Sequence, residues 1–172
     1  MDLAECIERR SSVRSFAPDP VPDDVIGEAL RLGNLAPSAG NLQARDFIVV
    51  KEQGTKRLLA EAALRQRFIE EAPVVIVCCA NLDRIGSYGS RGRELYCLQD
   101  VAAAVENMLL FFVDRGYASC WVGAFDERVA ARALGTPSRV RPVAMLPVGK
   151  AAGAEKRTPR MRPEEIVHYE RW

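Results

Sequence analysis

The chain has 172 residues, of which 48% are hydrophobic and 27% are charged. These values are typical of a globular protein with one core, and they exclude a disordered or fibrous class. The formal net charge is +1 and the pI is about 7.6, which excludes the broad positive field of proteins that bind nucleic acid or acidic membranes. Any anion site must therefore be local.

Cysteine and histidine usage bears on metal sites and on the redox compartment. The chain has five cysteines without a CxxC pair and one histidine, His168, so we expect no zinc site. Cys78 and Cys79 lie in an apolar run, which favours buried free thiols and a cytoplasmic location. We also expect no signal peptide and no membrane-spanning segment, because no apolar stretch approaches the necessary length.

The N-terminal third predicts two helices and a loop. Residues 2–10 carry apolar side chains at helical spacing behind Asp2, a favourable N-cap. A second helix is expected to begin at the proline and acids of 22–24 and to end near Gly33. Turn-forming residues fill 36–41, which predicts a loop rather than a regular element.

The middle of the chain alternates strands with helices. Residues 47–50 and 74–79 predict strands, the second apolar enough to be buried on both faces, and residues 55–70 predict a helix. The glycine-rich segment 86–92 is expected to be the most flexible internal part. The helix expected at 94–115 is apolar almost all round, which indicates burial in the core or against a second subunit.

The C-terminal third predicts a strand at 118–122, a helix at 126–134, a strand at 142–148 and then a charged, proline-bearing tail. This order of elements predicts one α+β domain, residues 1–172, with a mixed sheet. The tail is expected to dock on another surface, because its end carries the apolar residues Ile166, Val167 and Trp172.

Common catalytic signatures are missing from the sequence. With one histidine, in the tail, neither a Ser-His-Asp nor a Cys-His nucleophile has an evident base. Neither GxGxxG after a strand nor GxxxxGK[ST] occurs, so no helix N-terminus is indicated for a dinucleotide or a triphosphate. We therefore expect the chemistry to reside in a cofactor.

Arg10, Ser11, Ser12 and Arg14 place two guanidinium groups and two hydroxyls at the end of the first expected helix. A helix C-terminus repels anions, so a phosphate here would be held by side chains rather than by the helix dipole. The alternative is a solvated basic patch.

Two further segments offer polar groups to a ligand. Pro37, Ser38, Asn41 and Gln43 supply a hydroxyl, amides and exposed backbone suited to the edge of a planar heterocycle, although the segment alone is a connecting loop. Gly123 and Ala124 could leave backbone N–H groups free for a ligand, or the segment could simply be a strand end before an N-cap at Asp126.

Taken together, these segments resemble the nitroreductase family, because they follow the family's order along nearly the whole chain. Each motif is short, and the order carries the resemblance. The matching motifs are R-S-S-V-R-S-F (10–16), P-V-P-D-D-V-I (20–26), A-P-S-A-G-N-L-Q (36–43), F-I-V-V (47–50), A-P-V-V-I-V (72–77), D-V-A-A-A-V-E-N-M-L-L (100–110), C-W-V-G-A-F-D (120–126) and a tail ending E-E-I-V-H-Y-E-R-W.

The resemblance implies an α/β sandwich with a mostly antiparallel central sheet, in an intertwined homodimer with FMN bound at each of two interface sites. The tail 150–172 would dock on the partner subunit. The resemblance also implies the site residues. The phosphate and ribityl ligands look like Arg10, Ser11, Ser12 and Arg14, with Arg160 or Arg162 as a second phosphate arginine. The loop with Pro37, Ser38, Asn41 and Gln43 would meet the isoalloxazine ring from the partner subunit. Gly123 and Ala124 would place backbone N–H groups near flavin N5, and Gln66 would reach the pyrimidine edge.

The implied activity is hydride transfer from NAD(P)H to a small oxidised substrate, such as a nitroaromatic or a quinone, by a ping-pong mechanism. Alternatives are a different reductive reaction on the same flavin fold, such as dehalogenation or flavin remodelling, and a non-enzymatic module that binds a phosphate ligand. The chain departs from many members at Ala44-Arg45, where they have Pro-Trp, and at Gly123-Ala124, where some have Glu-Gly. Its expected substrate lid is short, about residues 84–96, with Tyr88 and Tyr96 as lid or ring-stacking residues.

Overall fold

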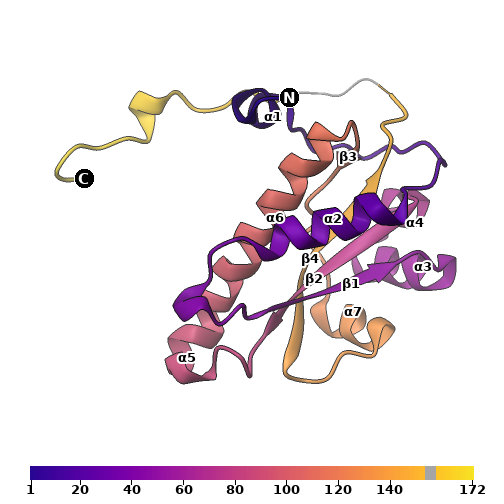
Figure 1. The fold of residues 1–172 in the computed structure, drawn as a ribbon. Helices are drawn as coiled ribbons and strands as arrows, with labels where there is room; N and C mark the ends of the chain where they lie inside the picture. Colours follow the sequence, from indigo (N-terminus) through magenta and orange to yellow (C-terminus); the bar gives the residue numbers. More distant parts are fainter. Residues whose placement is uncertain (154–157) are drawn as a thin grey trace.

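The computed structural model describes residues 1–153 and 158–172 (Figure 1). Four strands form a sheet in the order β1-β2-β4-β3, with β1 at Arg45–Val50, β2 at Val74–Asn81, β3 at Ala118–Ser119 and β4 at Val140–Gly149. The prediction of a mixed sheet is wrong, because all three ladders between these strands are antiparallel. Parallel pairing within the described residues is confined to the isolated bridge between Ser12 and Ser119.

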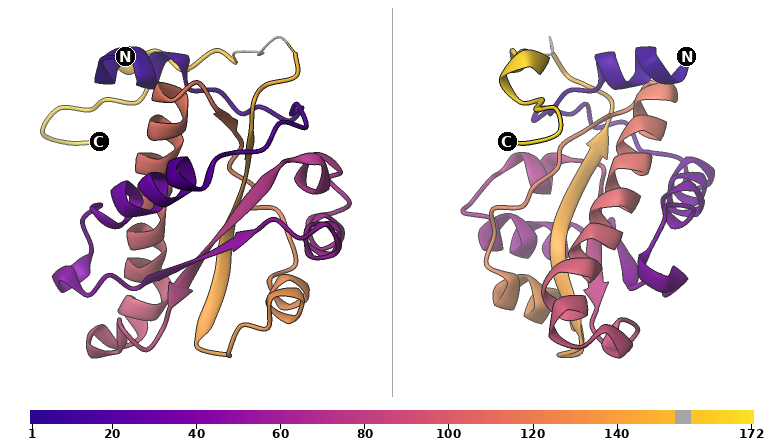
Figure 2. Two further views of the ribbon diagram at one scale, coloured as in Figure 1. Left: turned by 45° about the vertical axis from the view of Figure 1, so that its right-hand side comes forward. Right: turned by 90° about the vertical axis from the view of Figure 1, so that its left-hand side faces the viewer.

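The helices form two layers on opposite faces of the sheet. Helices α2 and α6 cover one face, and α3 and α7 cover the other (Figure 2). Their bounds, with those of the shorter helices, are α1 Leu3–Arg9, α2 Asp23–Asn34, α3 Gln53–Ala62, α4 Phe68–Glu71, α5 Gly89–Arg91, α6 Cys97–Asp114 and α7 Glu127–Leu134. The expected α+β class is confirmed.

Strand β2 explains why the sheet has two cores. Every residue of β2 is buried, and successive side chains of a strand point to opposite faces. Val74, Ile76 and Cys78 therefore pack with α2 and α6, whereas Val75, Val77 and Cys79 pack with α3 and α7. Burial raises the pKa of Cys79 to about 12 and raises that of Cys78 as well, so both remain protonated thiols that fill space.

Two expected helix starts are confirmed by their caps. The Asp2 carboxylate accepts from the Glu5 N–H at 2.8 Å, and α1 follows it. The Asp126 carboxylate accepts from the N–H groups of Arg128 and Val129, and α7 follows it. In both cases a carboxylate satisfies N–H groups that the first helical turn leaves without partners.

The prediction of one continuous helix over 55–70 is wrong, because the structure has two separate helices there. The structure ends α3 at Ala62 and begins α4 at Phe68, because Leu64 and Arg65 have φ values of 58° and 60°. A right-handed helix cannot continue through left-handed residues. The periodic apolar pattern therefore crosses a turn that it does not reveal.

The glycine-rich segment 86–92, which was expected to be flexible, has a defined local backbone conformation in the structure. It forms short helical turns, followed by a π-helical turn at Gly92–Tyr96 that leads directly into α6. Gly92 is buried, and a Cβ at this position would lie 2.8 Å from the Ile85 carbonyl oxygen. The glycine thus permits close packing of the chain rather than an open loop.

The strand expected at 118–122 is shorter than predicted. It ends at Ser119 as a continuous element, and pairing with β4 resumes at the isolated bridge between Val122 and Met145. Between them, the Cys120 N–H donates to the Pro147 carbonyl at 3.3 Å. Proline has no N–H to return, so the ladder is interrupted there.

Helix α6 and the turns before it form one helical run, Gly86–Asp114, which is 29 residues long. By length and composition this run is long and apolar enough to cross a membrane, contrary to the expectation from the sequence. Half of its most apolar window is buried inside the fold, and the core helix of a globular domain has the same composition. Here the run packs against α2 and the sheet.

Candidate functional site

The first part of the site is the segment that follows α1. The chain leaves the helix at Arg10 and extends beside β3, where the Val13 N–H donates to the Ser119 carbonyl at 3.0 Å. Alternation along the extended segment buries Val13 and leaves Ser12 and Arg14 exposed. The local sequence therefore presents polar side chains on one side while an apolar one anchors the backbone.

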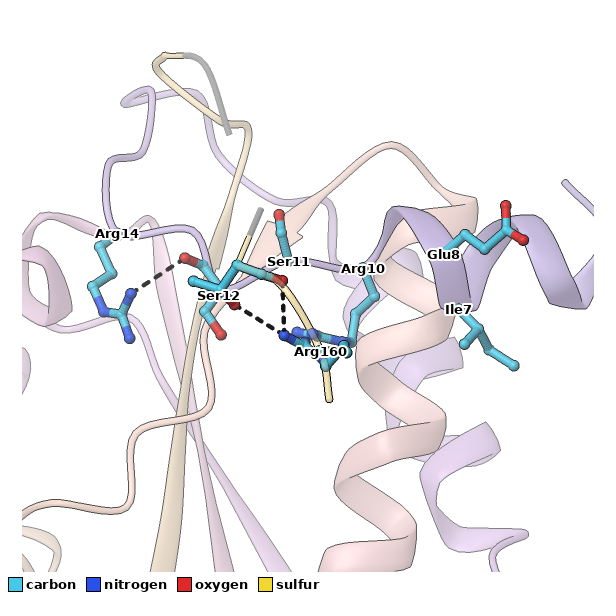
Figure 3. A pocket seen from close by; sticks show the side chains of 8 residues that line it. Ile7, Glu8, Arg10, Ser11, Ser12, Arg14 and Arg160 are labelled. Carbon is cyan, nitrogen blue, oxygen red and sulfur yellow. Dashed lines mark hydrogen bonds between the residues drawn. The ribbon is translucent and has the colours of Figure 1, made fainter. Parts of the chain in front are cut away.

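These side chains line a pocket of about 400 Å³ with two residues of the tail. Figure 3 shows Ser11 and Ser12 between the Arg14 side chain on one side and those of Arg10 and Arg160 on the other. Arg14 donates to the Ser12 carbonyl at 3.4 Å, and Arg160 donates to the Thr158 hydroxyl at 2.9 Å. We call this group, namely Arg10, Ser11, Ser12, Arg14, Thr158 and Arg160, the arginine pocket.

The arginine pocket carries excess positive charge. Glu8 also lines it, yet within residues 1–153 and 158–172 no carboxylate forms an ion pair with Arg10, Arg14 or Arg160. By contrast, Arg162 pairs with Glu165 at 3.6 Å. Unpaired guanidinium groups beside two serines form a donor set suited to a phosphate monoester.

Cys120 lies behind this segment and shares its electrostatic surroundings. Burial raises the pKa of the Cys120 thiol, and the positive charge of Arg14 opposes that rise. Cys120 is 1% exposed, so its thiol is part of the packed support behind the pocket and is not a surface nucleophile.

The second part of the site is the turn at Gly123-Ala124. Residues on both sides of the turn are anchored: the Val122 N–H donates to the Met145 carbonyl at 2.9 Å, and the Asp126 N–H donates to the Ala62 carbonyl at 2.9 Å. Within the part of the chain that the structure describes, the N–H groups of Gly123 and Ala124 donate to no protein acceptor. Two exposed donors are thus held between fixed points.

Gln66 belongs to this turn in the structure. From the turn between α3 and α4, its side-chain amide donates to the Ala124 carbonyl at 3.3 Å. The structure therefore brings together three of the residues proposed from the sequence, Gln66, Gly123 and Ala124, although 58 positions separate the two hydrogen-bonded residues.

The third part is the loop at 37–43, which has an unusual backbone. Gly40, Asn41 and Gln43 all have positive φ, at 55°, 56° and 50°. Positive φ in a residue with a side chain costs about 1–3 kcal/mol and persists only where the surroundings hold it. Here the Ser38 hydroxyl accepts from the Gln43 N–H at 3.0 Å, and the Gln43 side chain donates to the Asn41 carbonyl at 3.3 Å.

The structure does not bring this loop to the arginine pocket within one chain. The loop contacts the start of α6 through Asp100, whereas the N-terminus just before α1 contacts the other end of α6 through the pair between Met1 and Asp114. These two aspartates are 14 positions apart in α6, which corresponds to about 20 Å along the helix axis. Figure 1 shows the same arrangement, with α1 and the 37–43 loop near opposite ends of α6.

Three residues that support the loop were not identified from the sequence: Arg45, Arg84 and Asp100. At the Ala44-Arg45 position, where the chain departs from many members, the Arg45 side chain is 3% exposed and donates to backbone carbonyls. A sequence signal that could have pointed to this network is Asp100, an acid in a mainly apolar helix. Tyr88, expected in the lid, packs on Gly40, where an added Cβ would lie 2.7 Å from its hydroxyl oxygen.

Metal binding has no evident place here. In residues 1–153 and 158–172, no three potential ligands among histidine, cysteine and acids cluster together. All five cysteines are free and buried. The groups that the structure offers to a ligand are instead arginines, hydroxyls and backbone N–H donors.

A family model described as "Nitroreductase family" matches residues 7–66 and 56–150 of the chain. A curated protein named "NADH dehydrogenase" from Thermus thermophilus is 43% identical over 83 residues, which cover 48% of this chain and 40% of that protein. "FMN reductase (NADPH)" from Bacillus subtilis is 26% identical over 180 residues, covering 96% of this chain and 72% of that protein.

A solved structure supports the same relationship at the level of the fold. The NfrA1 nitroreductase of Bacillus subtilis superposes with a TM-score of 0.91 over 99% of this chain and 74% of that one. The sequence identity is 24%, so this likeness bears on the fold alone.

Proposed function

Because the chain belongs to the nitroreductase family, we propose that it is an FMN-dependent oxidoreductase that transfers hydride from NAD(P)H to a small oxidised substrate, such as a nitroaromatic or a quinone. The observation that carries the proposal is the arginine pocket, in which unpaired guanidinium groups from two distant segments surround two serines. The match to an FMN reductase over nearly the whole chain supports it.

The donor set fits the phosphate and ribityl parts of FMN. Arg10, Arg14 and Arg160 would bind the phosphate oxygens, because charge-assisted bonds from guanidinium to phosphate are strong and directional. Ser11 and Ser12 would donate to the same oxygens or to ribityl hydroxyls. Since the pocket follows the C-terminal end of α1, where the helix dipole repels anions, side chains must supply the positive charge there.

We propose that the complete site lies between two copies of the chain. One copy would supply the arginine pocket and the Gly123-Ala124 turn, and the other would supply the loop with Pro37, Ser38, Asn41 and Gln43. The distance of about 20 Å along α6 supports this division. So does the exposure of apolar side chains in the described part of one chain, on α1 and in the tail: Leu3, Ile7, Ile166, Val167 and Trp172.

When bound, FMN supplies the hydride acceptor and the electron donor for the second substrate. The protein's contribution would be positioning and electrostatic. The N–H groups of Gly123 and Ala124 donate to no protein acceptor in the described residues and lie in a turn anchored on both sides, so they would be available to a ligand. Gln66 holds the Ala124 carbonyl and thereby fixes the direction of that peptide. If one pocket serves both substrates in turn, the kinetics will be ping-pong.

An absorbance spectrum of the purified protein tests the cofactor. We expect a yellow protein from which heat releases FMN, and recovery of FAD, or failure to take up FMN, would refute the proposal. Sedimentation tests the subunit arrangement. We expect a dimer with an interface on the order of 2,000–5,000 Å², the range of obligate dimers, and a folded flavin-loaded monomer at micromolar concentration would contradict it.

A further inference from the structure

We propose that Arg45 and Asp100 are positioning residues. They hold segment 34–44 in the strained conformation in which it would contact the flavin bound to a second copy of the chain. This inference rests on the proposed function, because it assumes that the loop of one subunit meets the flavin of the other. It assigns a role to two buried charges that contact no part of the arginine pocket.

Arg45 holds the first half of the segment through backbone carbonyls. One terminal nitrogen donates to the Asn34 and Ala36 carbonyls at 2.8 and 2.7 Å. The other donates to the Pro37 and Asp100 carbonyls, both at 3.2 Å. A planar guanidinium thus ties the end of α2 and the start of the loop to α6.

Asp100 holds the second half through backbone N–H groups. Its two carboxylate oxygens accept from the Ala39 N–H at 2.9 Å and from the Ala44 N–H at 3.4 Å. Asp100 is 3% exposed, and its N–H partners lie on either side of the three residues with positive φ. The carboxylate therefore spans the strained turn.

The burial of these two charges needs a reason. Apolar side chains of similar volume commonly stabilise a fold as well as buried charged groups do, because the charges lose their hydration. Burial lowers the pKa of Arg45, the charge of Asp100 opposes that shift, and the Arg45 Nε is buried without a partner in the described residues. What the two residues provide is conformational: five hydrogen bonds to the backbone of one short segment.

Arg84 completes the hold from the outer side. It donates to the Gln43 carbonyl at 3.1 Å, to the Arg45 carbonyl at 2.6 Å and to the Asp46 carboxylate at 2.6 Å. The side chains of Ser38, Asn41 and Gln43 are thereby carried on a backbone fixed from inside and outside. Such a segment can meet a planar ligand without first losing conformational freedom.

Backbone hydrogen exchange and FMN titration together test this role, using the full chain. We expect Arg45→Met to accelerate exchange in 34–44, and Asp100→Asn, which preserves shape, to do so at Ala39 or Ala44. If the loop is then ordered in about one molecule in ten, the apparent Kd for FMN rises by about tenfold. The long-wavelength absorbance band of bound flavin should also shift, because the loop would contact the ring.

Lys56→Met is the matched control. Lys56 is a buried cation, 5% exposed, whose ammonium donates to the Ala72 carbonyl at 2.7 Å on the other side of the sheet. Its loss should destabilise the fold without changing exchange in 34–44. Arg45→Lys should restore part of the protection, because lysine keeps the charge opposite Asp100 but cannot reach four carbonyls.

The outcomes separate the two hypotheses. Unchanged exchange in 34–44 in both Arg45→Met and Asp100→Asn would overturn the positioning role. Faster exchange with unchanged FMN affinity and spectrum would show that the ordered loop does not serve the flavin, which also overturns it. A wild-type protein that takes up no FMN would instead refute the proposed function, together with the role toward flavin.

Discussion

The two ends of α6 differ in how their charged side chains are placed and bonded. At its C-terminal end, the arginine pocket holds three guanidinium groups that pair with no carboxylate in the described residues. At its N-terminal end, Arg45 and Asp100 are buried and form hydrogen bonds with the backbone of one loop. The first region is open and built from side chains, and the second is closed and presents backbone.

This difference indicates what each region can do. Unpaired surface charge attracts an anion from a distance, is screened by salt and gains partners only when the anion arrives. A backbone fixed by buried charges has a set shape before any ligand arrives, and salt acts on it weakly. The Gly123-Ala124 turn belongs with the second kind, because its available donors are N–H groups between two anchored residues.

The largest expected effect comes from deleting a backbone donor in that turn. Ala124→Pro removes one N–H while keeping the side chain small. If this donor stabilises charge that develops in the reaction, hydride transfer from the nicotinamide should slow by about 100-fold, the scale for loss of one preorganised donor. Stopped-flow measurement on the flavin-loaded dimer gives this rate directly.

Ala124→Ser is the control for crowding, because it keeps the N–H, and we expect it to be nearly silent. A proline variant that still dimerises, binds FMN and reacts at the wild-type rate would remove the turn from the mechanism. An equal loss in the serine variant would indicate packing rather than hydrogen bonding.

Charge reversal in the arginine pocket is expected to have the next largest effect. Arg14→Glu replaces attraction by repulsion and should weaken FMN binding by about 3 kcal/mol, roughly 100-fold. Salt should weaken FMN binding by the wild type more than by the variant, which keeps Arg10 and Arg160 but carries less net positive charge. Fluorescence titration at low and high salt measures both, and an unaltered Kd would show that the basic cluster is only a solvated face.

The structure also assigns different surroundings to two tail arginines that the sequence could not separate. Arg160 lines the pocket, whereas Arg162 pairs with Glu165. Arg160→Ala should therefore weaken FMN binding by about 1.5 kcal/mol, roughly tenfold, while Arg162→Ala should not. The same titration decides between them, and the reverse result would mean that the tail takes another position in the dimer.

Local sequence signals predicted the fold where the interactions are local. The caps at Asp2 and Asp126 and the apolar run of β2 act within a few residues, and the structure contains all three. The division of 55–70 was missed because left-handed Leu64 and Arg65 carry no glycine or proline to announce them. Leu3 and Ile7 were expected on an apolar face, yet they are 68% and 55% exposed in one chain.

The site followed the same rule. Arg10, Ser11, Ser12 and Arg14 are neighbours in sequence, so their common pocket could be anticipated. The contact between Arg45 and Asp100 joins positions 55 residues apart, and nothing near either residue identifies its partner. A charge inside a strand or an apolar helix indicates only that some partner exists.

The smallest expected effect concerns the anchor after the Gly123-Ala124 turn. Hydrogen bonds from the N–H groups of Val129 and Arg128 hold the pKa of the Asp126 carboxyl below its usual value. A group whose pKa is lower in the folded state stabilises the fold above its unfolded pKa, and this contribution is lost as the pH falls through the folded value.

Asp126→Ala should thus lower Tm by about 2–4 °C near neutral pH, the scale for loss of one cap in a domain of this size. The difference should begin to shrink as the pH falls below about 4, the ordinary pKa of a free aspartate, and should be lost as the pH falls through the lower pKa of the folded state. Asp126→Asn, which still caps the helix and does not titrate, should show a small difference from the wild type near neutral pH. Calorimetry of the three proteins across this pH range measures the effect, and an alanine penalty that persists unchanged near pH 3 would mean that α7 and the turn before it are held by packing rather than by the cap.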